Sequence, residues 1–118
     1  MEYTLFVYGT LKRGFSNHHL LQGAEYVGAA KTLEKYSLYE SGIPYVFKGE
    51  AVSHIYGELY LVDELTLKKI DRLEGHPGWY RREKVEVLTE NGVTVAAWLY
   101  FYPEIRGKLV KTGRYEQR

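Results

Sequence analysis

Two segments of the sequence carry apolar side chains on both of their alternating faces, and this pattern restricts the possible folds more than any other feature. Residues 3–8 are almost entirely β-branched and aromatic, and residues 55–62 repeat the pattern. A strand with two apolar faces has to be covered on both sides. We therefore expect an α+β fold, in which a small mixed, mostly antiparallel β-barrel is flanked by one or two helices.

One helix is predicted clearly, over residues 64–74. Asp63 precedes it and can accept hydrogen bonds from the first backbone N–H groups, while Gly75 is a typical residue after a helix end. Its apolar side chains form one stripe, made up of Leu67, Ile70 and Leu73. A shorter helix is expected over residues 18–21, with Asn17 as its cap.

The C-terminal half predicts a β-hairpin followed by a polar tail. Residues 80–90 and 93–102 are rich in strand-forming side chains and are joined by Asn91-Gly92, a strong hairpin signal. The tail from Pro103 onward is expected to be irregular. All of these elements fit one domain over residues 1–118.

The composition excludes several kinds of partner and site. Sixteen Lys and Arg against fifteen Asp and Glu give a net charge of +1, too small to attract nucleic acid or a membrane surface. No cysteine is present, which excludes a disulfide scaffold, a thiolate zinc site and a cysteine nucleophile. No apolar run approaches the ~20 residues of a membrane span. We expect a soluble, cytoplasmic protein; nothing in the sequence specifies an oligomeric state.

The turn after the first strand is a candidate binding loop. Tyr8-Gly9-Thr10-Leu11 leaves a buried strand through a glycine, which can adopt backbone angles that other residues avoid. Successive N–H groups could then face one concavity and bind a carboxylate or an oxyanion. The alternative is an ordinary strand end.

Glu74 is a candidate proton-transfer residue. It follows Ile70 by four positions and Leu67 by seven, so it falls on the core-facing stripe in the last turn of the predicted helix. The negative end of the helix dipole and partial burial would both raise its pKa, as a general base near neutral pH requires. The alternative is a solvated glutamate at the rim. The four histidines show no metal-binding spacing, so we expect no metal site.

Two blocks of sequence resemble the gamma-glutamylcyclotransferase-like family, and most of all its gamma-glutamylamine cyclotransferase branch. The first is residues 5–14 with Asn17-His18 after them, and the second is residues 71–77 with Tyr80-Arg81-Arg82 after them. Their order and spacing also fit, and the resemblance covers nearly the whole chain.

This resemblance implies an enzyme that converts a gamma-glutamyl group to 5-oxoproline and releases an amine or amino acid. Its partner is a small-molecule gamma-glutamyl substrate, and no metal or organic cofactor is implied. Glu74 would be the general acid/base. The substrate-binding residues expected on this basis are Tyr8, Gly9, Thr10, Leu11, Tyr80, Arg82 and Tyr115.

The implied mechanism needs no protein nucleophile, because the α-amine of the substrate attacks its own γ-carbonyl. A base has to remove a proton from that amine, and the same group can then protonate the leaving amine. The alternative function is a non-catalytic module that binds a small carboxylate or a protein on the same fold. A tyrosine-rich sheet that stacks nucleic-acid bases is disfavoured, because no basic groove accompanies it.

Overall fold

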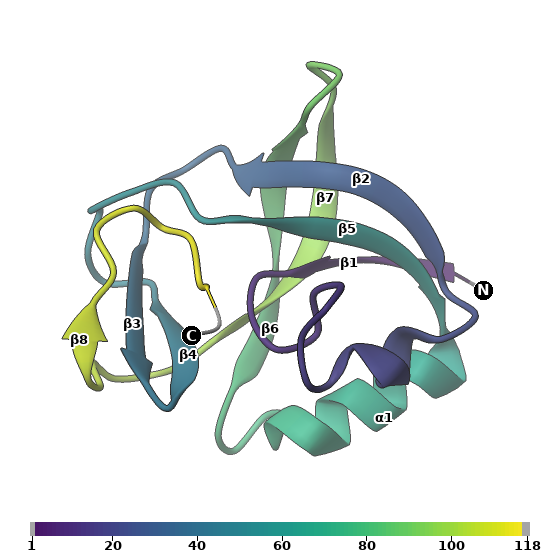
Figure 1. Ribbon diagram of the computed structural model, residues 1–118, viewed down its shortest axis with the longest axis horizontal. Coiled ribbons are helices and arrows are strands. Elements are labelled where there is room, and N and C mark those ends of the chain that lie inside the picture. Colours follow the sequence, from purple (N-terminus) through teal and green to yellow (C-terminus); the bar gives the residue numbers. More distant parts are fainter. Residues whose placement is uncertain (1, 117–118) are drawn as a thin grey trace.

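The computed structural model describes residues 2–116 and shows a β-barrel, a small second sheet and a helix packed below the barrel (Figure 1). The elements follow the chain in this order: β1 (Glu2–Val7), the 3-10 helix η1 (His18–Leu21), β2 (Glu25–Thr32), β3 (Ser37–Ser41), β4 (Ile43–Phe47), β5 (Tyr56–Asp63), α1 (Glu64–Glu74), β6 (Arg81–Thr89), β7 (Thr94–Phe101) and β8 (Lys108–Leu109).

The barrel closes through its first strand. Its strand order is β1-β5-β2-β6-β7, and β4-β3-β8 form the second sheet beside it. β1 pairs antiparallel with β5 along its whole length and parallel with β7, where Leu5 lies opposite Trp98. The other pairings are antiparallel. The expected α+β fold with a small, mixed, mostly antiparallel barrel is thereby confirmed.

The two apolar faces of β1 are both covered, as its sequence requires. Leu5 and Val7 belong to a core cluster that includes Leu67 of α1, whereas Phe6 belongs to a second cluster with Leu59 and other residues. Leu5 and Phe6 are both fully buried. β1 therefore runs through the middle of the molecule, and its C-terminal end opens directly onto the loop at Tyr8.

The helix α1 forms at the predicted residues. The Asp63 carboxylate accepts a hydrogen bond from the Thr66 N–H at 2.7 Å, and Gly75 ends the helix with a left-handed φ of 68°. Leu67 and Ile70 are buried, but Leu73 is 44% exposed. The prediction that Leu73 belongs to the buried stripe is therefore wrong. In the last turn of α1 it is Glu74, and not Leu73, that points toward the interior.

Three local predictions need correction or detail. The helix η1 is of the 3-10 type, and Asn17 makes no side-chain capping hydrogen bond to it. The tail is not wholly irregular, since β8 pairs with β3. The β6–β7 hairpin turns at the predicted dipeptide, with a φ of 82° at Gly92.

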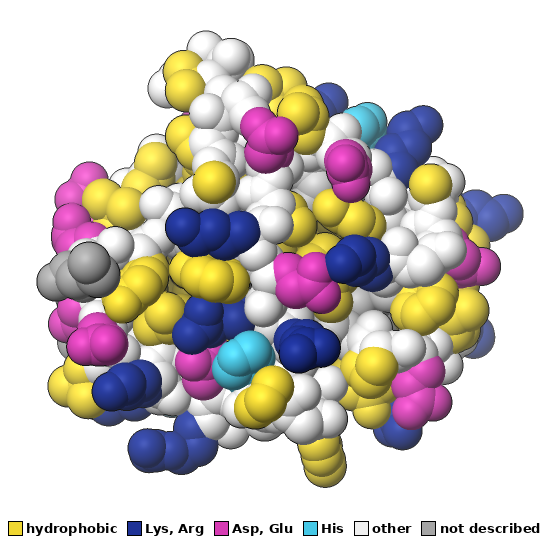
Figure 2. Space-filling view, turned by 180° about the vertical axis from the view of Figure 1, so that it is seen from behind, with side chains coloured by type: hydrophobic (Ala, Val, Ile, Leu, Met, Phe, Trp, Pro, Cys, Tyr) yellow, Lys and Arg dark blue, Asp and Glu magenta, His cyan; other side chains and the backbone are white. Residues whose placement is uncertain are grey.

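Charged side chains of both signs are interspersed across the centre of the face shown in Figure 2. Within residues 2–116 no helix is long and apolar enough to cross a membrane.

Candidate active site

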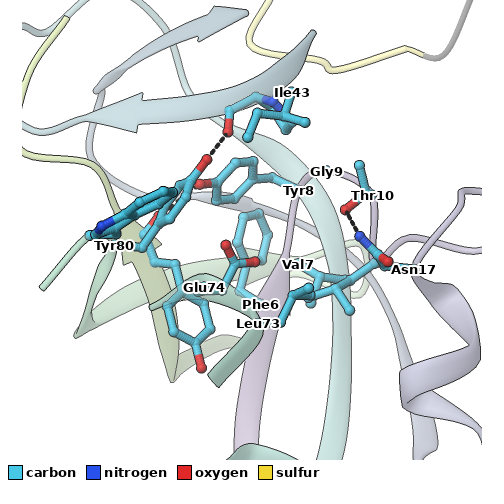
Figure 3. Close-up of a pocket in the computed structure, with 14 residues that line it drawn as sticks. Phe6, Val7, Tyr8, Gly9, Thr10, Asn17, Ile43, Leu73, Glu74 and Tyr80 are labelled. Carbon is cyan, nitrogen blue, oxygen red and sulfur yellow. Dashed lines mark hydrogen bonds between the residues drawn. The ribbon is translucent and has the colours of Figure 1, made fainter. Parts of the chain in front are cut away.

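A pocket of about 230 Å³ lies where the end of β1 meets the last turn of α1. The loop after β1 forms one wall, the start of β4 forms a second, and the end of α1 with the loop after it forms a third (Figure 3). The volume is below the usual range of about 300–1,000 Å³ for sites that bind drug-sized ligands, so the pocket suits a smaller group. Its lining residues are Phe6, Val7, Tyr8, Gly9, Thr10, Leu11, Asn17, Ile43, Pro44, Leu73, Glu74, Trp79, Tyr80 and Tyr100.

The carboxylate of Glu74 points into this pocket, in the space bounded by Phe6, Tyr8 and Tyr80 (Figure 3). Its side chain makes no hydrogen bond or ion pair with any of residues 2–116. Burial is therefore unopposed, and it raises the pKa of Glu74 from 4.5 to about 7. Near neutral pH the group is thus present in both protonation states, as a group that accepts and returns a proton should be.

The loop of residues 8–11 stands across the pocket from Glu74. The N–H groups of Gly9, Thr10 and Leu11 donate no hydrogen bond to any described residue, so they are available to an anionic or carbonyl oxygen. The reason we gave for Gly9 was wrong, because its φ is not positive. A Cβ at this position would lie 2.4 Å from Cγ of Pro44, so glycine is required for close packing.

Two buried tyrosines form a rigid wall of the pocket. The Tyr8 hydroxyl donates to the carbonyl of Tyr100 at 2.8 Å, and the Tyr80 hydroxyl donates to the carbonyl of Pro44 at 2.8 Å. Burial raises the pKa of both hydroxyls far above neutral, and the nearby Glu74 adds to this effect. Both hydroxyls stay protonated at neutral pH and are engaged with backbone carbonyls, so these side chains shape the pocket.

Asn17 is a pocket residue that we did not predict as part of the site. Its side-chain amide donates to the hydroxyl of Thr10 at 2.9 Å, and its backbone N–H donates to the Thr10 carbonyl at 2.9 Å. The two bonds hold the loop of residues 8–11 in place. The only sequence signal for this role was the place of Asn17 beside the first family-like block.

Two residues that we expected to bind substrate lie away from the pocket. Arg82 donates two hydrogen bonds to Asp71, from Nε at 2.8 Å and from Nη2 at 3.1 Å. Tyr115 packs its ring against Phe15, with ring centroids 5.7 Å apart. The structure thus brings together Tyr8, Gly9, Thr10, Leu11, Glu74 and Tyr80 but not Arg82 or Tyr115. Within residues 2–116 no three His, Asp or Glu side chains converge as metal ligands would.

Comparison with known proteins assigns a family to this fold and pocket. The family described as "Gamma-glutamyl cyclotransferase, AIG2-like" matches residues 5–117. A protein of Methanocaldococcus jannaschii that carries the provisional name gamma-glutamylcyclotransferase is 54% identical, over 98% of this chain and 97% of its own. Gamma-glutamylaminecyclotransferase B of Danio rerio is 34% identical, over 86% of this chain and 59% of its own.

Solved structures agree with this assignment. The crystal structure of an AIG2-like protein from Mus musculus superposes with a TM-score of 0.84 at 28% identity, covering 99% of this chain and 97% of that one. YkqA from Bacillus subtilis superposes with a TM-score of 0.81 at 36% identity, over 98% of this chain and 40% of that one. The chain described here belongs to the gamma-glutamyl cyclotransferase, AIG2-like family.

Proposed function

We propose that this protein converts the gamma-glutamyl group of a small molecule to 5-oxoproline and releases the attached amine or amino acid. The observation that carries the proposal is Glu74, an unpaired carboxylate with a pKa of about 7 that points into a pocket. The unpaired N–H groups of residues 9–11 in the same pocket support it, as do the names of the relatives. A cytoplasmic location stays a prediction.

The proposed reaction needs a group that accepts a proton, and it needs the α-amine of the substrate to be held close to the γ-carbonyl carbon. The Glu74 carboxylate accepts a proton from the substrate's α-ammonium group, and the free amine then forms a bond to the γ-carbonyl carbon. The N–H groups of the loop stabilise the negative oxygen that develops on that carbon. Protonated Glu74 returns that proton to the leaving nitrogen as the old C–N bond breaks. The ring nitrogen then loses its second proton, which the released amine takes up to leave as an ammonium ion. Holding the amine against the carbonyl lowers the barrier further, by up to about 7–11 kcal/mol in favourable cases.

The first test is Glu74→Gln, which keeps the shape of the side chain and removes proton transfer. We expect 5-oxoproline release from γ-glutamyl compounds to fall about 10²- to 10⁴-fold. In the unchanged protein kcat/KM should fall as the pH drops below about 7, because protonated Glu74 cannot accept a proton. The exposed Glu64 on the same helix supplies the matched control, Glu64→Gln, which should keep full activity and the same pH profile.

Folding is checked in the same variant. The folded-state pKa of Glu74 lies above the 4.5 of the unfolded chain, so its contribution to stability is present below pH 4.5 and is lost as the pH rises through about 7. The loss is on the order of 3 kcal/mol. Glu74→Gln should therefore be at least as stable as the unchanged protein at pH 8.

Undiminished 5-oxoproline release by Glu74→Gln would contradict the proposed function. Thermal stabilisation by 5-oxoproline without any turnover would instead indicate a binding module.

A further inference from the structure

A second cavity lies directly beside the proposed active site, and Trp79 borders both. This cavity also holds about 230 Å³. Its walls include Phe47, Lys48, Pro77, Arg81 and Tyr102. Tyr102 packs edge-on against Tyr80 of the first pocket, with centroids 5.1 Å apart. The two cavities therefore adjoin at Trp79 and at the contact between Tyr80 and Tyr102.

The mouth of the first pocket is apolar and open to solvent. Ile43 is 45% exposed, Leu73 is 44% exposed and Trp79 is 72% exposed, although all three line the pocket. Leaving three large apolar side chains in water is unfavourable by itself, so their gathering at one mouth points to a ligand with an apolar part. The charged gamma-glutamyl group has little apolar surface to offer. The amine attached to it is the part of the substrate that would cover this rim.

The charges of the second cavity leave one cation free. The Lys48 ammonium pairs with Glu83 at 2.6 Å. Arg81 is exposed, and none of residues 2–116 gives it a carboxylate, hydrogen-bond or ring partner through its side chain. A guanidinium group binds a carboxylate through two parallel hydrogen bonds more readily than an ammonium does. The Arg81 guanidinium is therefore available to bind an anion in the second cavity, beside Trp79.

We propose that this second cavity is the subsite for the leaving group, and that its ligands are amines with an aliphatic chain that ends in a carboxylate. The chain crosses the face of Trp79 beside the apolar rim, and its carboxylate pairs with Arg81. The inference rests on the proposed function, since it assigns the released half of the same substrate. It makes Trp79 and Arg81 the residues that select among γ-glutamyl compounds.

Binding measurements test the subsite without requiring turnover. Matched γ-glutamyl amides are prepared in pairs whose leaving chains hold one, three or five methylenes and end in either a carboxylate or a methyl group. Dissociation constants are measured by calorimetry on Glu74→Gln. The same measurements are repeated after adding Arg81→Gln or, as a control with the same charge change, Arg114→Gln. Arg114 is exposed and stacks on Tyr56 at 4.0 Å, at a different cavity.

We expect the carboxylate member of the five-methylene pair to bind about two- to fivefold more tightly, the range for one exposed ion pair. Arg81→Gln should abolish that preference and Arg114→Gln should keep it, while Trp79→Ala should weaken both members of the pair. Equal binding of the two members at all three lengths, or a preference that survives Arg81→Gln, overturns the subsite. Binding with this preference, but without 5-oxoproline release by the unchanged protein, supports the subsite and contradicts the proposed reaction instead.

Discussion

Glu74 and Asp71 lie one turn apart on α1, yet their surroundings move their pKa values in opposite directions. Burial would raise the pKa of Asp71 as well, but hydrogen bonds from Arg82 and Tyr100 outweigh it, and the net shift is downward. For Glu74 no hydrogen bond or cation opposes the effect of burial, and burial raises its pKa to about 7. Asp71 is therefore a fixed anion that anchors the helix, and Glu74 is left free to exchange a proton.

At the same scale, Gly9→Ala tests how tightly the loop of residues 8–11 is packed. The added Cβ would lie 2.4 Å from Cγ of Pro44, far inside van der Waals contact, so the β3–β4 turn or the loop has to move. We expect a loss of about 1–3 kcal/mol in unfolding free energy, as for other overpacked sites. A raised KM for γ-glutamyl substrates should accompany it. Urea denaturation and steady-state kinetics measure the two effects.

Two further variants test whether the contact between position 9 and Pro44 causes the loss of stability. In Gly78→Ala the new Cβ would meet its nearest neighbour, the carbonyl of Gly75, at an ordinary 3.7 Å, so little stability should be lost. Pro44→Ala removes the atom that Gly9→Ala strikes. The double variant should therefore recover part of the loss, and a purely additive result would show that the contact with Pro44 is not the cause.

The individual site residues differ in how far the sequence predicted them. Glu74 could be placed because helical periodicity and two helix-end signals fix its direction. Gly9 was recognised for the wrong reason, because its contact with Pro44 joins residues that are far apart in sequence. The partner of Arg82 was missed for another reason. Asp71 and Arg82 meet across the loop between α1 and β6, and the conformation of that loop leaves no pattern in the sequence of either element.

At the scale of elements, α1 is attached to the barrel by a polar network at the turn that carries Glu74. Asp71 accepts two hydrogen bonds from Arg82 of β6 and one, at 2.5 Å, from the Tyr100 hydroxyl of β7. The Arg82 guanidinium also lies 4.4 Å from the ring centroid of Trp98 on β7. Both strands of the hairpin therefore hold the end of the helix.

Arg82→Gln should loosen this attachment. The variant leaves the partly buried Asp71 carboxylate without its cation, and we expect about 1–3 kcal/mol of stability to be lost at pH 7. The lowered pKa of Asp71 makes its contribution present at neutral pH and lost as the pH falls through the folded-state value, so the variant should also be less sensitive to acid. Thermal denaturation from pH 3 to 7 measures both effects.

An exposed arginine on the same strand provides the comparison. Arg81→Gln removes the same charge one residue earlier, where the side chain has no partner among the described residues, and should leave stability within about 0.5 kcal/mol. If Arg82→Gln also changes the pH at which activity falls, the network positions Glu74 in addition to stabilising the fold. Equal stability of the two variants would show that the ion pair contributes nothing measurable.

The elements with strong local signals were predicted, and those that depend on distant partners were not. The helix α1 has a capping residue, an apolar stripe and a terminal glycine within its own sequence, and the hairpin has its glycine turn. The two-residue strand β8 has no such signal, since it exists only because β3 offers an edge. The parallel contact of β1 with β7, which closes the barrel, is equally invisible in either strand alone.

For the whole molecule, the C-terminal segment up to Tyr115 packs against the loop that follows β1. The Lys12 ammonium donates to the backbone carbonyl of Tyr115 at 2.7 Å, and the ring of Tyr115 is 7% exposed against Phe15. The N–H of Tyr56 donates to the carbonyl of Gly113 at 3.0 Å, which ties the tail to β5. The segment after β8 thus forms part of the core under the N-terminal loop, and we expect its loss to affect the whole fold.

Tyr115→Ala tests this closure and the role of the tail together. Removing a large buried ring should cost about 3 kcal/mol of unfolding free energy, while Tyr115→Phe, which keeps the ring, should retain most of the stability. Because the ring lies outside the pocket, any effect on kcat/KM should follow from the lost support of residues 12–15 and should be regained at lower temperature, where the fold is restored. Denaturation curves and kinetics at 10 °C and 37 °C separate these effects. A loss of substrate binding that persists in the fully folded variant would instead support our first expectation, that Tyr115 contacts the substrate.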